Sequence, residues 1–88
     1  MQANINVKFS DDQGNSVKER LSLDFEDELS INEMECQIED KITEWFYDIS
    51  YQLFLSIYHG RDSDDGFDSA YGDYLKRTKL DSDYMLFN

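Results

Sequence analysis

The stretch from Ser30 to His59 constrains the fold most, because it is typical of one long amphipathic helix. Ser30 and Glu33 have the spacing of a capping box, and Gly60 supplies the residue type that often ends a helix. A helix of this length spans roughly 45 Å at about 1.5 Å per residue. Its apolar residues recur every three or four positions and predict one buried face: Ile31, Met34, Ile38, Ile42, Trp45, Ile49, Leu53 and Ile57.

The other faces of this helix differ along its length. Beyond Ser50 the apolar residues surround the axis, so this end is expected to be buried all round, under the rest of the chain or under a second subunit. A break between Asp48 and Tyr51 is the alternative to one continuous helix. Placed at about 100° per residue, four acids lie opposite the apolar face, with Gln37 in the same row: Glu33, Asp40, Glu44 and Asp48.

Two strands are predicted before the helix, joined by a polar turn from Asp11 to Ser16. A lone hairpin is marginally stable, so we expect the helix to cover its apolar face. Glu19 falls on the apolar side of the second strand, which suggests a sheet edge. The alternating apolar residues are Ile5, Val7 and Phe9 in the first strand and Val17, Leu21, Leu23 and Phe25 in the second.

A second helix is predicted from about Phe67 to Lys79, interrupted by Gly72, with a cationic last turn that suits a helix C-terminus. The apolar end, Tyr84 to Phe87, is either a third strand or a tail packed on the core. The fold class is therefore α+β, in the order ββαα or ββααβ, with one domain over residues 1–88.

Composition limits the partners. Twenty acids against eight bases give a formal charge of −12, which disfavours direct binding to nucleic acid or an anionic membrane and favours a basic protein partner. The single cysteine excludes an intramolecular disulfide. We see neither a signal peptide nor a membrane span, so we expect a cytoplasmic protein, in a bacterial host if the chain is phage-encoded.

No catalytic, cofactor or metal site is expected. The loop from Asp62 to Gly66 resembles a calcium loop, but Arg61 and Gly72 occupy positions that need oxygen ligands. His59 is expected near a helix C-terminus, where a capping role is usual. Cys36 lacks the positive neighbours that activate a thiol. We therefore expect a protein that is not an enzyme.

The acidic surface is the feature that indicates a function. Between Asp24 and Asp48 there are ten acids and one base, Lys41, although a merely solvated helix face usually mixes both signs. Helix neighbours four residues apart lie about 6 Å apart along the axis, against about 3.4 Å for phosphates of one DNA strand. We expect the partner-binding acids to be Glu33, Glu35, Glu39, Asp40, Glu44 and Asp48 of the helix with Asp62, Asp64 and Asp65 of the loop.

In its size, acidity, aromatic content and lack of proline, the chain resembles the small phage-encoded nucleic-acid mimics. This class includes anti-CRISPR proteins, uracil-DNA glycosylase inhibitors and anti-restriction proteins. The resemblance covers the whole chain and rests on these general properties rather than on a residue motif. It implies a cytosolic inhibitor of a host nucleic-acid enzyme, with an anti-CRISPR protein as the first choice.

Two other functions fit the same sequence. An immunity protein or antitoxin would use the same acidic surface against a basic toxin. A homodimer or larger oligomer would instead bury the apolar segment from Tyr51 to Tyr58, with the acids serving only for solubility. Tyr47 and Tyr51 are candidate interface anchors, although core packing is the more common role of such residues.

Overall fold

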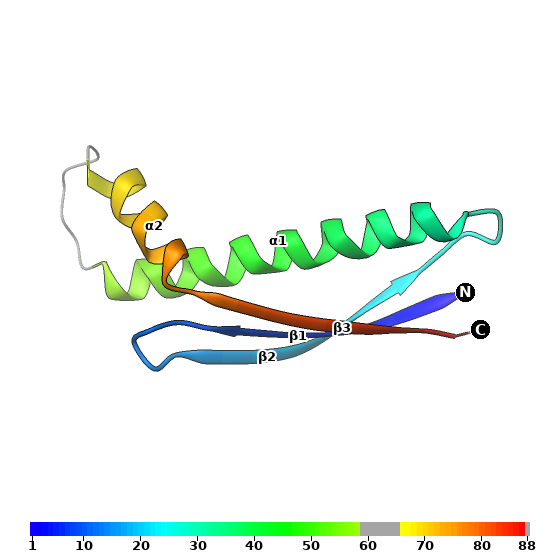
Figure 1. Cartoon of the computed structure of the whole chain (residues 1–88), viewed down its shortest axis with the longest axis horizontal. Helices are drawn as coiled ribbons and strands as arrows, with labels where there is room; N and C mark the ends of the chain where they lie inside the picture. The colour runs from blue at the N-terminus through cyan, green and yellow to red at the C-terminus, as the bar shows by residue number, and fades with distance from the viewer. Residues whose placement is uncertain (59–65, 88) are drawn as a thin grey trace.

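The computed structural model describes residues 1–58 and 66–87 and has the order ββααβ (Figure 1). The C-terminal segment is a strand, which begins well before the predicted Tyr84. The three strands form one antiparallel sheet in the order β2-β1-β3, and α1 lies along one side of it. The elements are β1 (Gln2–Ser10), β2 (Ser16–Asp24), α1 (Ile31–Ile57), α2 (Phe67–Lys76) and β3 (Lys79–Phe87).

The core lies between β1 and α1. β1 is the central strand, and its helix-side residues are buried because they have neighbouring strands on both sides and α1 above them. This confirms that the long helix covers the hairpin. The buried residues are Ala3, Ile5, Val7 and Phe9 of β1 with Met34, Ile38 and Trp45 of α1.

Helix α1 begins as the sequence predicts. The Ser30 hydroxyl accepts the backbone N–H of Glu33 at 3.2 Å, although the Glu33 carboxylate makes no return bond among the described residues. The helix continues without a break through Asp48 and Tyr51 to Ile57. The predicted end at His59 and Gly60 lies outside the described residues.

The predicted apolar stripe is wrong at both ends of α1. Ile31 is 65% exposed and Ile57 is 39% exposed. The 27 residues of α1 span about 40 Å, whereas nine-residue strands span about 30 Å. Figure 1 shows that the Ile57 end of α1 reaches past the β1–β2 turn, whereas at the Ile31 end the helix and the sheet diverge. Only the middle of the stripe is therefore covered.

The end of α1 packs against α2 through one side. Ser50 and Phe54 are buried there, and the Phe54 ring lies 5.2 to 5.5 Å from three aromatic rings of α2. The described part of the chain does not bury this end all round, because α2 covers only that side. Burial under a second subunit stays a prediction. The residues left exposed are Tyr51, Leu55 and Ile57.

Helix α2 is shorter than predicted. It ends at Lys76, so Lys79 begins β3 instead of completing a cationic last turn. Gly72 does not interrupt the helix. A Cβ atom added at Gly72 would meet nothing within 4 Å outside its own helix.

Asp11 ties α2 to the hairpin turn. Its carboxylate accepts the backbone N–H groups of Gln13 and Asn15, each at 2.9 Å, and the Tyr74 hydroxyl at 2.6 Å. Partial burial acts to raise the pKa of Asp11, but these hydrogen bonds outweigh it and hold the pKa below its ordinary value of 3.8. Burial and the bond to Asp11 raise the pKa of Tyr74. Gly14 completes the turn at a φ of 87°.

We predict that Gly72→Ala stabilises the protein by about 1 kcal/mol, because alanine is the better helix former and the site has room for its methyl group. Urea denaturation would measure the change. Gly14→Ala is the matched control and should destabilise by about 1 kcal/mol, because L-residues avoid positive φ. A loss of stability in Gly72→Ala would contradict the described helix.

We predict that Asp11→Ala destabilises the protein by about 2 kcal/mol at pH 7, because several donors lose a charged acceptor. A carboxyl with a lowered pKa stabilises the fold above its ordinary pKa and loses this effect as the pH falls through the folded-state value. The difference in the free energy of unfolding between Asp11→Ala and the original protein should therefore narrow below pH 3.8. Asp12→Ala is the control: it removes an exposed ion pair with Arg77 and should lower the free energy of unfolding by less than about 1 kcal/mol. A pH-independent difference for Asp11→Ala would contradict this role.

Candidate functional site

The six predicted helix acids are all exposed, but they do not form one stripe. At about 100° per residue, Glu35 and Glu39 lie roughly opposite the other four on the helix circumference. The clefts of the molecule agree with this division. Glu44 and Asp48 line a cleft that includes Leu21 of β2, whereas Glu35 and Glu39 line a cleft with β3. The six acids therefore lie in two groups on different flanks of α1.

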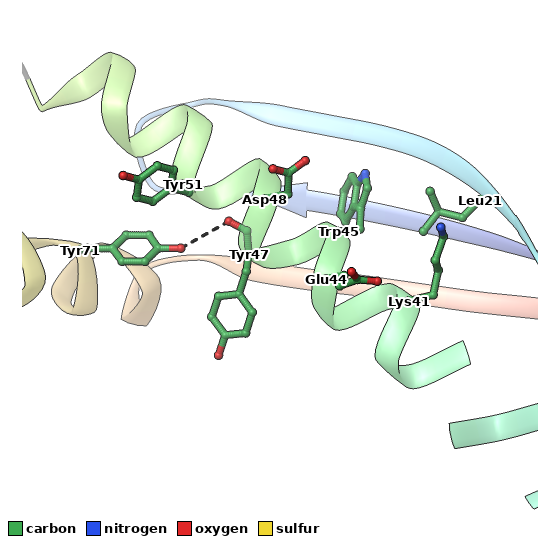
Figure 2. Close-up of a pocket in the computed structure, with 8 residues that line it drawn as sticks. All are labelled: Leu21, Lys41, Glu44, Trp45, Tyr47, Asp48, Tyr51 and Tyr71. Carbon is green, nitrogen blue, oxygen red and sulfur yellow. Dashed lines mark hydrogen bonds between the residues drawn. The ribbon is translucent and has the colours of Figure 1, made fainter. Parts of the chain in front are cut away.

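The cleft on the β2 side, called here the α1–β2 cleft, has a volume of about 710 Å³. Figure 2 shows Trp45 and Asp48 near each other along α1, with Tyr47 directed away from them. Acidic side chains, tyrosines and a single base together line this cleft. The lining residues are Leu21 of β2, Lys41, Glu44, Trp45, Tyr47, Asp48 and Tyr51 of α1, and Tyr71 of α2.

Trp45 is fixed at this cleft by Glu19. The indole Nε1–H donates to the Glu19 carboxylate, which reaches across from β2. This contact explains why an acid interrupts the apolar side of a strand, since a buried indole needs an acceptor for its N–H. Sequence reasoning noticed that Glu19 was out of place but missed its partner, which only the packing of α1 on β2 identifies.

Tyr51 is positioned by α2. The Tyr71 hydroxyl lies 2.9 Å from Ser50 Oγ and donates to the backbone oxygen of Tyr47 at 3.5 Å. The Tyr71 ring then meets the Tyr51 ring edge-on, with centroids 5.8 Å apart. Tyr47 is 52% exposed and Tyr51 is 43% exposed, so neither is a core residue. Both are available as rigid aromatic contacts at the rim of the acidic flank.

The other flank faces β3. A cleft of about 510 Å³ lies between the two elements, with Glu35 and Glu39 on the helix and Tyr84 on the strand. The Tyr84 hydroxyl donates to Glu35 Oε1 at 3.5 Å. This flank has a carboxylate rim above an apolar floor of Ile38 and Ile42.

Four of the described bases lie on the opposite side of the molecule from α1. Side chains alternate along β1, so those next to its buried residues point to the sheet face that α1 does not cover. Lys8 lies opposite Lys18 on this open face, and Asn6 lies opposite Arg20. Lys79 joins them from β3, along with three acids, Asp24, Asp81 and Asp83. Six acids and one base on α1 therefore face away from four bases and three acids on the sheet.

The remaining predicted residues fall into two groups. Asp62, Asp64 and Asp65 lie outside the described residues, as does His59. Cys36 is exposed. In the part of the chain that the structure describes, no group of three or more His, Cys, Asp or Glu residues could hold a metal ion, and no helix is long and apolar enough to cross a membrane.

No family model, curated protein or solved structure matches the chain.

We predict that Glu19→Ala destabilises the protein by about 1 to 2 kcal/mol, because the buried Trp45 indole loses its acceptor. Glu19→Gln keeps an acceptor oxygen at the same place and should recover most of that loss. Urea denaturation followed by tryptophan fluorescence would measure both variants. Equal losses in the two variants would contradict the hydrogen bond as the source of the effect.

Proposed function

We propose that the chain is a non-enzymatic inhibitor of the anti-CRISPR type. Its acidic α1 surface occupies the nucleic-acid-binding site of a basic protein, a CRISPR effector or another host nuclease. The observation that supports this proposal is the uneven distribution of charge, with six exposed acids and one base on α1 against four bases and three acids on the open face of the sheet. A purely solubilising surface has no need to keep the two signs apart.

The acids of α1 form no ion pair with another described residue. Over residues 1–58 and 66–87 one ion pair is formed, between Arg77 and Asp12 at 3.4 Å, and it lies away from α1. Like charges on one helix repel each other and destabilise it slightly. A partner surface of Lys and Arg residues removes this repulsion and releases its own bound counterions, as it does on binding nucleic acid.

The α1–β2 cleft supplies more than charge. Glu44 and Asp48 offer carboxylates for charge-assisted hydrogen bonds to a guanidinium or ammonium group. Tyr47 and Tyr51 offer exposed ring faces for the same cations. Tyrosine is enriched among residues that dominate interface energies, because it gives a large contact area at a low entropic cost. We therefore place the anchor of the interface at this cleft.

Two alternatives remain as proposals. An immunity protein or antitoxin would use this same surface against a basic toxin. Self-association is favoured by a separate observation, the exposed apolar side chains of Tyr51, Leu55 and Ile57 at the end of α1. Light scattering distinguishes the oligomer from a monomeric inhibitor.

We predict that reversing three charges on α1, with Asp40→Lys, Glu44→Lys and Asp48→Lys combined, abolishes capture of the target. The protein would be used as bait in a lysate that contains candidate host nucleases. Bound proteins would be eluted with graded salt and, separately, with excess DNA or guide RNA. Release of a nuclease by both agents supports mimicry, because nucleic acid then competes for one basic site.

The matched control makes the same change in net charge away from α1, with Asp24→Lys, Asp27→Lys and Asp68→Lys combined. These three acids are exposed, so the control should fold and still capture the target. Full capture by the α1 variant would refute both the nuclease inhibitor and the antitoxin. Equal loss in the two variants would show that overall charge, rather than the α1 surface, controls binding.

A further inference from the structure

β3 forms an unprotected edge of the sheet. All nine of its residues pair with β1, and no described residue pairs with its other side. An edge strand presents a row of backbone N–H and C=O groups that another strand can use. Proteins usually block such edges with proline, bulges or lysines, and β3 has only Lys79, at its first position.

The side chains of β3 are exposed on both faces. Leu80 and Tyr84 share the helix side of the sheet with their buried partners Phe9 and Ile5, yet they are 37% and 44% exposed. α1 packs on β1 and does not extend over β3. On the open face, Met85 is 69% exposed and Phe87 is 38% exposed. The strand therefore has both an unpaired backbone and uncovered apolar side chains.

The charge around this edge is negative on both faces. Asp81 and Asp83 lie on the open face of β3, and Glu35 and Glu39 line the cleft on its helix side. The opposite edge strand, β2, differs because Lys18 and Arg20 occupy the middle of its open face. Both edges border a cleft with two helix acids, but the open face carries Lys18 and Arg20 at the β2 edge and Asp81 and Asp83 at the β3 edge. Only the β3 edge is therefore acidic on both faces.

A second copy of β3 fits this edge poorly. If two copies paired antiparallel with both helices on the same face and Asp83 at the centre, Asp83 would lie opposite Asp83. Directly opposed like charges destabilise a strand pair. The same arrangement brings Glu35 and Glu39 of both copies toward one another. A strand of opposite charge removes both conflicts.

We propose that the β3 edge is a strand-addition site for an extended, basic segment of a partner protein. Backbone hydrogen bonds to β3 hold the segment, and its side chains alternate between the two faces. Lys or Arg residues on one face reach Glu35 and Glu39, and those on the other reach Asp81 and Asp83. This site is separate from the α1–β2 cleft and does not depend on nucleic-acid mimicry.

The test uses the whole protein and a capped nine-residue peptide in which Lys-Lys pairs alternate with Val-Val pairs, so that an added strand carries Lys on both faces. Binding is measured by calorimetry, and amide hydrogen exchange locates it. We expect saturable binding with new protection in Lys79–Phe87. Asp81→Lys should weaken binding about tenfold, since it replaces attraction by repulsion at the added strand. Asp68→Lys makes the same change in charge on α2, outside both clefts, and should leave binding of this peptide unchanged.

Two control peptides separate strand addition from simple charge attraction. A peptide of the same charge with proline in place of valine cannot pair with an edge and should not bind. A peptide of alternating Glu and Val should not bind either. Equal binding of the proline peptide, or protection in β2 instead of β3, would overturn the proposal. Self-association that protects β3 without any peptide would also overturn it, because a second copy would then be the occupant.

Discussion

The burial of β1 beneath α1 is the contact on which the rest of the structure depends. A helix is about 10 Å wide with its side chains, and strands lie about 4.8 Å apart, so one helix covers roughly two strands. The helix side of the central strand is therefore buried, with Ile5 and Phe9 at 0% exposure. The third strand must remain partly uncovered, as the exposed helix-side residue Tyr84 shows. One helix over three strands thus produces both the small core and the open β3 edge.

Helix α2 compensates for this limited core at one end. It packs aromatic rings against Phe54 and joins the β1–β2 turn through the Tyr74–Asp11 hydrogen bond. Ser50 matters here because its small side chain lets α2 approach closely and its hydroxyl meets Tyr71. The same contact orients Tyr51 at the rim of the α1–β2 cleft. The packing that stabilises the fold therefore also shapes the candidate binding surface.

Local patterns predicted the fold well. Alternation identified the hairpin, and the three- to four-residue period identified α1 with its Ser30 cap, because both signals are contained in neighbouring residues. The exposure of Ile31 and Ile57 depends instead on where the sheet runs beneath the helix. The Glu19–Trp45 bond depends on which strand lies under the helix. Such facts follow from the tertiary arrangement, which the pattern of one segment does not contain.

The candidate site was predicted in composition but not in shape. All six helix acids are exposed as expected, and helical geometry alone separates Glu35 and Glu39 from the other four. The consequence of that separation appears only when β2 and β3 are placed on either side of α1. Each flank then has its own apolar neighbours, with tyrosines beside Asp48 and strand β3 beside Glu35. Two acidic flanks with different surroundings favour two distinct contacts with a basic partner, one through side chains and one through the strand backbone.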